Sequence, residues 1–470
     1  MPVSADQVLQ LCKVLKGFAP REKLSLADYV NAIPRLESLA DVPSGTAVLV
    51  RGDVDCEPGE QIGDEDIRLR SMRETLEFGR AKGWKQIIFG HRGRKKEGKP
   101  IGSLDKVAKR LGEILGCEVP LVKDWLDESA ARLKPHVGQQ IADAAPGSVI
   151  VLENVRAYDL ETNLWKAEEK DLPAIAPKLA ALANSLAEQV ANVYVNEALS
   201  AGSLDASSTV VPLAMDRVAL GKYVAREFEQ PMQECLKAEL VIFSGIKIDK
   251  LDDLEAIIAR GTVRAIFSAG SLAMALKKAD AQLAGSDFCL GASENPANKK
   301  ESWYILPERI EQAKTMLQAG KSRGIEFVLP VDFKLADGSV AKTLQPQDQQ
   351  FDIGPESIAL FENKVSEFIA AHRGRPAVVF HNGVFGMFEK PEFEAGTKAF
   401  VAQLQRMHAA GLKVYVGGGE GGKALELYGG TGWAKTITHC FTAGGTVLNA
   451  LGAEPVPYLV ALRAAAKRRS

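Results

Sequence analysis

Short apolar segments alternate with amphipathic segments along most of this chain of 470 residues. The apolar segments are continuous runs rich in Val and Ile, which is typical of parallel strands buried on both faces. Helical stretches separate them, so the pattern predicts an α/β fold in which helices cover open parallel sheets. Strands are expected at 47–50, 86–89, 149–152, 193–195, 240–243, 265–268, 326–329, 377–380, 414–416 and 438–442.

The expected strands, about ten, are too many for one ordinary doubly wound sheet, so two sheets are predicted. The segment 223–237 has a helical pattern interrupted by Pro231 and no strand signal, so it is the expected connection between two lobes. Residues 1–40 precede the first strand and also have a helical pattern, so we expect an added helical element there.

Composition excludes several classes of protein. Hydrophobic residues make up 46% of the chain and charged residues 25%, with a formal net charge of −2, so a soluble globular protein without nucleic-acid or membrane partners is expected. No run approaches the roughly 20 apolar residues of a membrane helix, and residues 1–16 lack a signal-peptide pattern. The six cysteines are scattered without a CxxC pair, which favours a reducing cytoplasm over a zinc site or a disulfide framework.

Arginines follow the expected strands of the first half. Arg51, Arg94 and Arg156 come after the first three strands, and Arg68 follows a loop rich in Gly and Asp. Because ligands of parallel sheets bind beyond the carboxyl ends of the strands, these side chains are expected to converge on one crevice. Guanidinium groups bind carboxylate and phosphate oxygens in pairs, so the sequence predicts an anion site. A solvated charged rim is the alternative interpretation.

Glycine-rich turns follow the strands of the second half. The turn at 417–422 lies between a strand and a helix, where glycine lets the backbone approach an anion and free N–H groups point at it. Any one such turn can be an ordinary tight connection, but five together predict a nucleotide laid across the strand ends. The other four turns lie at 244–247, 268–271, 381–389 and 442–445.

Other phosphate-binding and catalytic motifs fit less well. The spacing from Gly417 to Lys423 matches a Walker loop, but Ala424 supplies no hydroxyl for Mg²⁺ and no Walker B strand follows. A dinucleotide GxGxxG motif is absent after the first strand, and His91 is the only histidine expected in a site, which disfavours a Ser-His-Asp triad. An anion site and a nucleotide surface on two lobes instead indicate phosphoryl transfer, with lobe closure excluding water.

The order of these motifs resembles the phosphoglycerate kinase family over roughly residues 45–460. The family's VRVDFN is similar to residues 50–55 here, and its SHLGR to residues 90–94. The family's WNGPMGVFE is similar to residues 381–389, and its GGGDS to residues 417–421. Further matches lie at 64–71, 152–157, 193–197, 329–332, 352–355 and 441–447.

The resemblance implies two Rossmann-like, doubly wound parallel-sheet domains joined by a connecting helix. Its expected parts are a helical extension at 1–40, an acid-binding domain at 41–220, a connecting helix at 221–237, a nucleotide-binding domain at 238–450 and a tail at 451–470 that returns to the first domain. It implies reversible phosphoryl transfer between ATP or ADP and the carboxyl group of 3-phosphoglycerate, with Mg²⁺, in a cytoplasmic monomer.

The resemblance also implies roles for individual residues. Those expected to act on the transferred phosphoryl group are Arg68, Lys247, Gly418, Gly419, Gly444 and Gly445. Those expected to bind the acid are Asp53, Asp55, Arg68, His91, Arg94 and Arg156. Those expected to bind the nucleotide are Gly245, Lys250, Asn382, Glu389, Gly417, Gly418, Gly419, Glu420 and Gly421, with Glu420 also associated with the metal.

The chain departs from the family's pattern at three places. Residues 200–208 align with GTAHRAHSS, but both histidines and the arginine that holds the substrate phosphate are gone, and Asp205 is new. Arg92, Lys95 or Lys96 would have to fold inward to replace that arginine. The spacing between Lys247 and Lys250 is shortened, and residues 420–421 replace a metal-linked Asp and a hydroxyl residue.

These departures leave three hypotheses open. The chain is a working phosphoglycerate kinase, a related phosphotransferase that acts on another carboxylic acid, or a non-catalytic nucleotide-binding protein.

Overall fold

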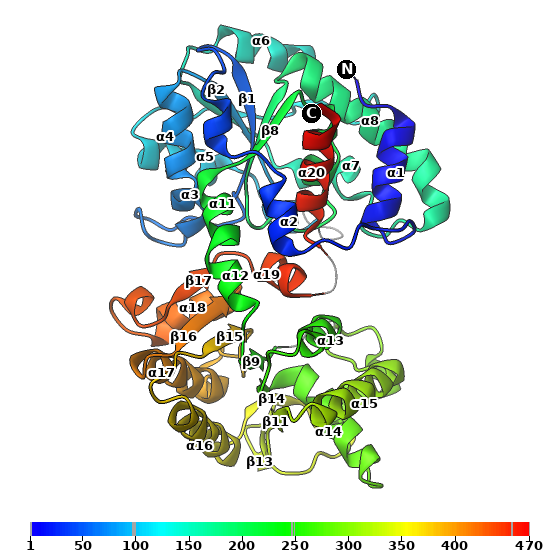
Figure 1. Cartoon of the computed structure of the whole chain (residues 1–470), viewed down its shortest axis with the longest axis vertical. Helices are drawn as coiled ribbons and strands as arrows, with labels where there is room; N and C mark the ends of the chain where they lie inside the picture. Colours follow the sequence, from blue (N-terminus) through cyan, green and yellow to red (C-terminus); the bar gives the residue numbers. More distant parts are fainter. Residues whose placement is uncertain (1, 96–99, 246–247, 249, 453–454, 470) are drawn as a thin grey trace. The chain divides into compact units, whose positions relative to one another are not determined.

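The computed structural model describes residues 2–95, 100–245, 248, 250–452 and 455–469. The chain divides into two compact units (Figure 1). The first consists of Met1–Gln230 and Pro455–Ser470, and the second of Pro231–Glu454. Two residues named above, Lys96 and Lys247, lie outside the described residues.

The first unit contains a six-stranded parallel sheet with the strand order β3-β6-β2-β1-β7-β8. The chain winds outward in both directions from β1, so the carboxyl ends of β1, β2 and β7 meet where the winding reverses. The strands are β1 (Ala47–Gly52), β2 (Lys85–Phe89), β3 (Leu121–Val122), β6 (Val149–Leu152), β7 (Val193–Glu197) and β8 (Arg217–Leu220), with a separate hairpin of β4 (Leu126–Asp127) and β5 (Arg132–Leu133).

Helices lie on both sides of this sheet in Figure 1, with α4 and α5 on one side and α8 and α20 on the other. The α-helices are α1 (Ala5–Leu15), α2 (Leu26–Asn31), α3 (Ile67–Ser71), α4 (Arg73–Ala81), α5 (Asp105–Leu115), α6 (Pro135–Asp143), α7 (Asp159–Thr162), α8 (Leu172–Gln189), α9 (Ala206–Thr209), α10 (Val211–Ala214), α11 (Lys222–Glu229) and α20 (Pro457–Arg469). Short 3₁₀ turns are η1 (Leu36–Leu39), η2 (Val155–Ala157) and η3 (Glu169–Asp171).

The continuous apolar pattern of the strands is explained by burial on both faces. Val48 and Val50 of β1 share one core with Leu76 of α4 and Leu111 of α5. Leu49 points to the opposite face and is equally buried. The rigid sheet that results fixes the backbone from which the strand-end loops start.

The second unit contains another six-stranded parallel sheet, with the order β11-β10-β9-β15-β16-β17. Its strands are β9 (Leu240–Phe243), β10 (Ala265–Ser268), β11 (Glu326–Val328), β15 (Val378–Asn382), β16 (Lys413–Gly417) and β17 (His439–Phe441). An antiparallel sheet of β12 (Phe333–Leu335), β13 (Val340–Ala341) and β14 (Gln350–Ile353) accompanies it. The predicted α/β fold with two parallel sheets is confirmed.

Helices of the second unit bury apolar faces against this sheet, as Phe361 and Phe400 do against Val414 and Val416. The α-helices are α12 (Pro231–Cys235), α13 (Lys250–Arg260), α14 (Gly270–Leu283), α15 (Pro307–Ser322), α16 (Pro355–Ala371), α17 (Ala395–Ala409), α18 (Gly419–Tyr428) and α19 (Gly444–Leu451). The 3₁₀ turns are η4 (Gly291–Glu294), η5 (Pro296–Asn298), η6 (Pro391–Phe393) and η7 (Trp433–Lys435).

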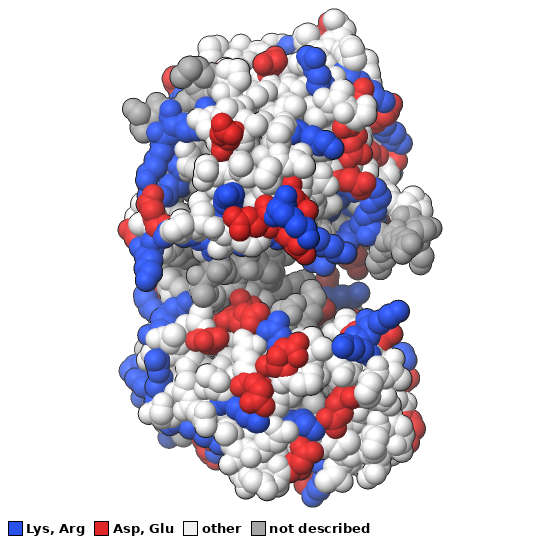
Figure 2. Space-filling view, turned by 90° about the vertical axis from the view of Figure 1, so that its right-hand side faces the viewer, with Lys and Arg blue, Asp and Glu red and all other residues white. Residues whose placement is uncertain are grey.

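Basic and acidic side chains are interspersed on the face of the molecule that Figure 2 shows. This mixture agrees with the small formal net charge of −2. Among the described residues, no helix has both the length and the apolar character needed to cross a membrane.

Candidate active site

The arginines predicted to converge in the first unit do come from neighbouring strand ends. Arg51 is the penultimate residue of β1 and lies opposite Phe89 of β2 on one side and Asn196 of β7 on the other. Arg156 lies in η2, shortly after the end of β6, which pairs with β2. Adjacent parallel strands therefore deliver these side chains to one edge of the sheet.

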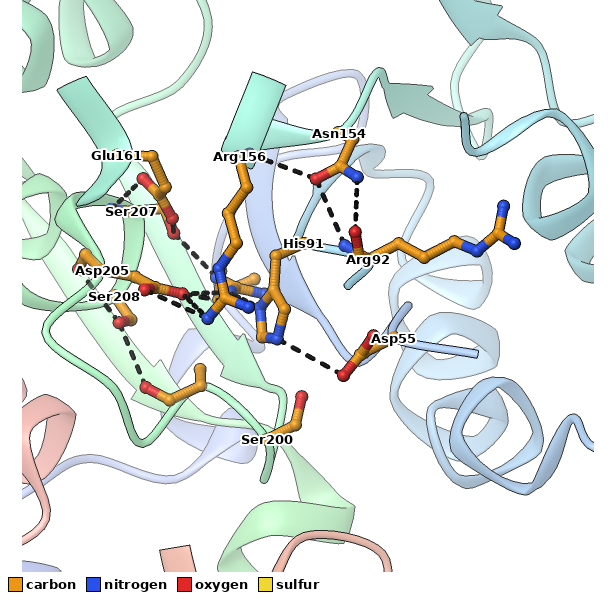
Figure 3. A network of polar contacts seen from close by, with 12 residues as sticks. Asp55, His91, Arg92, Asn154, Arg156, Glu161, Ser200, Asp205, Ser207 and Ser208 are labelled. Atoms are coloured by element: carbon orange, nitrogen blue, oxygen red, sulfur yellow. Dashed lines mark hydrogen bonds and ion pairs between the residues drawn. The ribbon is translucent and has the colours of Figure 1, made fainter. Parts of the chain in front are cut away.

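Asp205 contacts two of these arginines, Arg51 and Arg156, and Figure 3 shows it beside Arg156. Its Oδ2 is 2.9 Å from Arg156 Nη2 and 3.5 Å from Arg51 Nη2. Asp205 and Arg51 are fully buried, and Arg156 is 5% exposed. Separating such a buried pair is costly, because no water is available to solvate either charge in place of its partner. The carboxylate that the sequence flagged as new is thus an internal counterion.

Trp165 completes the surroundings of Asp205. Its indole Nε1 donates a hydrogen bond of 3.0 Å to Asp205 Oδ1. Its ring faces two cations, with the guanidinium carbon of Arg156 at 4.7 Å and that of Arg94 at 5.5 Å from the ring centroid. Such contacts hold guanidinium groups in place without an anion. Arg94 is exposed, unlike Arg51 and Arg156.

A second buried acidic side chain, Glu161, is connected to Arg51 through Ser207. It accepts hydrogen bonds from the backbone N–H and the hydroxyl of Ser207, and Ser207 Oγ in turn accepts from Arg51 Nε at 2.8 Å. Burial, with a further contribution from the charge of Asp205, raises the pKa of Glu161 to about 8. Glu161 is therefore mostly protonated at neutral pH.

His91 is buried against the same arginines. Arg51 Nη2 lies 2.7 Å from His91 Nδ1, and an arginine can only donate, so Nδ1 accepts. The ring proton then lies on Nε2, which is 3.7 Å from Asp55 Oδ2. Burial, and then the neighbouring arginines, lower the pKa of His91 well below its ordinary value. His91 is a neutral side chain with a fixed tautomer.

Arg68 is held by the two aspartates that follow β1. Its Nη1 lies 2.9 Å from Asp55 Oδ2, and its Nε lies 3.8 Å from Asp53 Oδ1. Asp53 also accepts a hydrogen bond of 2.7 Å from the Ser200 hydroxyl. Burial raises the pKa of Asp53, and Arg68 and Ser200 offset only part of that shift. The predicted acid-binding residues Asp53, Asp55, Arg68 and His91 are thus neighbours.

The cations proposed to replace the missing arginine have other partners. Arg92 pairs with Glu57 and donates to the Ser103 carbonyl at 2.6 Å. Lys95 Nζ lies 2.7 Å from Asp159 Oδ1. Within the described part of the chain, the basic motif that residues 200–208 lack is therefore not restored by Arg92 or Lys95.

Asn154 organises the site but was not predicted. Its side-chain Nδ2 donates to the carbonyls of Arg92 and Gly102, each at 2.8 Å, and its Oδ1 accepts from the N–H groups of Arg92 and Arg156 (Figure 3). Asn154 lies two residues after the end of β6, and this position close to a strand end is the signal that would have found it. Trp165 and Glu161 were also missed, and they lie too far beyond a strand end for such a signal.

In the second unit, the glycine turns bring two helix N-termini together. Gly418, with φ of 102°, separates β16 from α18, and Gly444 begins α19 after β17. A Cβ on Gly444 would lie 2.7 Å from the Gly418 Cα, so the close approach requires glycine. Asn382 supports the turn by donating to the Gly417 carbonyl at 2.8 Å. Paired helix starts of this kind suit phosphate oxygens.

The absence of a hydroxyl at position 421 has a packing cause. Gly421 is buried, and a Cβ there would lie 2.8 Å from Val416 Cγ1 and 3.8 Å from His381 Nδ1. His381 is itself buried beside Phe385 and Phe400, and burial, followed by the charge of Lys250, lowers its pKa to about 3. Glycine at 421 therefore follows from the core beneath the turn.

The remaining predicted nucleotide residues are spread over these turns. Lys250 is buried and donates to the carbonyls of Ser244 and Asn382, at the ends of β9 and β15. Gly245 has φ of 98°. Glu389 and Glu420 are both exposed.

The donor set for Mg²⁺ is small. The described residues contain no group of three or more His, Cys, Asp or Glu side chains that could hold a metal ion. Mg²⁺ is usually bound by one or two carboxylates together with substrate phosphates, and the exposed Glu420 in the first turn of α18 fits that arrangement. Such an ion would come with the nucleotide and would neutralise phosphate charge.

Known proteins resemble this chain in sequence and in fold. A family model described as phosphoglycerate kinase matches residues 39–454. Phosphoglycerate kinase of Bifidobacterium longum (strain DJO10A) is 30% identical over 445 residues, covering 91% of this chain and 99% of that protein. The cytosolic phosphoglycerate kinase of Triticum aestivum is 29% identical over 435 residues, covering 89% of this chain and 95% of that protein.

A solved structure has the same fold. The crystal structure of phosphoglycerate kinase from Pyrococcus horikoshii OT3 matches with a TM-score of 0.70 at 22% identity, over 93% of this chain and 100% of that one. The family model covers most of the chain and its relatives match over nearly their full length, so this chain belongs to the phosphoglycerate kinase family.

Proposed function

We propose that this chain transfers a phosphoryl group between ATP or ADP and the carboxyl group of a small acid bound in the first unit. Family membership supports a kinase-type phosphotransferase, and 3-phosphoglycerate is the acid that it indicates. The observation that carries the proposal is the grouping of Arg68 with Asp53, Asp55 and neutral His91 at one sheet edge.

The reaction needs charge neutralisation and positioning rather than a covalent nucleophile. A carboxylate oxygen attacks the γ-phosphorus, the bond to the bridging oxygen breaks, and ADP and an acyl phosphate result. Arg68, fixed by two aspartates, would neutralise charge on the transferred group. The N–H groups at the starts of α18 and α19, including those of Gly419 and Gly445, would bind phosphate oxygens.

A coupled assay with MgATP and 3-phosphoglycerate tests the proposal. Turnover above that of an Arg68→Ala variant would support it. A panel of other carboxylic acids, scored for ATP-dependent acyl phosphate, extends the test. If no acid is phosphorylated above the Arg68→Ala level while calorimetry detects tight MgADP binding, the chain is a nucleotide-binding protein and the proposed function is wrong.

A second candidate, transfer to an acid other than 3-phosphoglycerate, is favoured by one observation. Asp205 places a buried carboxylate between Arg51 and Arg156. In the panel assay this candidate fails if 3-phosphoglycerate alone is phosphorylated.

A further inference from the structure

We propose that the acid substrate is a small hydroxycarboxylate that carries no phosphate group, because the Asp205 carboxylate takes the anion position between Arg51 and Arg156. This inference rests on the proposed function and names the substrate class of that same site. Glycerate is the probe of choice, since it differs from 3-phosphoglycerate only by the phosphate.

Both oxygens of Asp205 are already satisfied. Oδ1 accepts from Arg156 Nη2 at 3.2 Å and from Trp165 Nε1 at 3.0 Å. Oδ2 accepts from Arg156 Nη2 at 2.9 Å and from Arg51 Nη2 at 3.5 Å. The side chain is fully buried, so this geometry is built into the folded unit. The carboxylate supplies what a bound anion would otherwise supply.

The two arginines have few donors left for a ligand. Each nitrogen of Arg51 is engaged, Nε by Ser207, Nη1 by the Gly52 carbonyl, and Nη2 by His91 and Asp205. In Arg156, Nη1 donates to the Gly93 carbonyl at 2.8 Å and Nη2 to Asp205, while Nε is buried without a partner. A phosphate would have to break the pairs with Asp205 to be bound by both guanidinium groups.

Repulsion by Asp205 also disfavours a phosphate at this position. The Asp205 carboxylate lies 2.9 Å from Arg156 Nη2. A phosphate on Arg156 would lie within about 6 Å of Asp205, where like charges disfavour each other's ionised form. Asp205 would therefore repel the phosphate dianion of a substrate, whereas it would not repel an uncharged hydroxyl or methylene group.

The groups that remain suit an uncharged, polar substrate body. Among the described arginines at this sheet edge, Arg94 is the exposed one, and it lies beside the half-buried Trp165 ring, where it can meet a single carboxylate. Ser200, which is half-buried and donates its hydroxyl hydrogen to Asp53, keeps an oxygen that can accept from a substrate hydroxyl. The reaction needs no reactant besides the acid and ATP, because a carboxylate oxygen takes the γ-phosphoryl group to give the acyl phosphate and leaves ADP.

The test compares glycerate with 3-phosphoglycerate in the full-length protein, with MgATP and hydroxylamine to trap acyl phosphate. We expect the wild type to have a kcat/KM for glycerate at least about tenfold above that for 3-phosphoglycerate, and Asp205→Asn to shift this ratio toward 3-phosphoglycerate by about tenfold or more. Asp124→Asn, which removes an exposed carboxylate paired with Lys134, should leave the ratio unchanged. A wild-type preference for 3-phosphoglycerate would overturn the inference.

A binding measurement separates this inference from the proposed function. Inorganic phosphate should raise the Tm of Asp205→Asn and Asp205→Ala by several degrees more than that of the wild type or Asp124→Asn, because phosphate refills the vacated position. Circular dichroism checks that both Asp205 variants fold. If no acid is turned over, the proposed function is wrong, but the phosphate comparison still tests whether Asp205 occupies the anion position. An equal rise of Tm in the wild type and in the Asp205 variants would contradict the inference.

Discussion

Asp205 and Arg156 form a buried ion pair, with Asp205 Oδ2 and Arg156 Nη2 2.9 Å apart and 49 residues separating them in the chain. The pair links the loop after β7 to the 3₁₀ turn after β6. It neutralises an arginine that the sequence predicts to bind an anion.

Asp205→Ala should lower the free energy of unfolding of the first unit by about 3–5 kcal/mol, because it leaves Arg156 buried without its counterion. Urea unfolding followed by intrinsic fluorescence measures the loss. Asp124→Asn removes the exposed charge partner of Lys134, keeps a residue type that tolerates the backbone φ of 49° at this position, and should cost less than about 1 kcal/mol. Equal losses in the two variants would show that the buried pair has no special role.

Arg68→Ala should lower kcat for the preferred acid by about 10²–10³-fold, as removal of a group that stabilises transition-state charge typically does. Arg68→Lys should recover part of this loss, because a point charge replaces the fork. Arg73→Ala is the matched control, since the Arg73 side chain is 59% exposed and pairs with Glu77 one helical turn away on α4. Steady-state kinetics distinguishes the three variants.

Gly421→Ala should destabilise the second unit by about 1–3 kcal/mol, because its new Cβ overlaps Val416 Cγ1. Gly419→Ala, in the same helical turn but with no atom within 4 Å of its Cβ position, should change stability little. Adding Val416→Ala to Gly421→Ala should reduce the steric penalty. Thermal unfolding tests this, and a Gly421→Ala variant as stable as the wild type would refute the packing explanation.

Glu161 should make stability depend on pH. Its pKa rises on folding from an ordinary value of 4.5 to about 8, with burial as the main cause. Between these values the folded state holds a proton that the unfolded state releases, so stability falls as pH rises from about 4.5 to about 8. Glu161→Gln removes this contribution, so the wild type should lose stability relative to Glu161→Gln across that window. Exposed Glu188→Gln should follow the wild type in chemical denaturation at each pH.

The sequence predicted the fold more fully than the site. Each expected strand is present, because a continuous apolar run is visible within a few neighbouring residues. The strand β3, Leu121–Val122, was missed because two residues are too few to form a recognisable hydrophobic pattern. The strand β8, Arg217–Leu220, was missed since it is short and begins with a charged residue.

The predicted roles of the site residues stay predictions, but their placement shows what the sequence can reveal. Arg51 and Arg156 were found because a residue directly after a parallel strand has a known position. Asp205 and Arg156 were both noticed, but their pairing was not predicted, because a contact across 49 residues depends on the path of the intervening chain. Trp165 and Glu161 were missed for the same reason.

The side chain of Asn154 joins the backbones of the segment after β2 and the segment after β6. Two further hydrogen bonds join them, from the Val155 N–H to the Gly90 carbonyl and from Arg156 Nη1 to the Gly93 carbonyl. The two segments therefore form one mechanical part, and a displacement of either would carry His91 and Arg156 together.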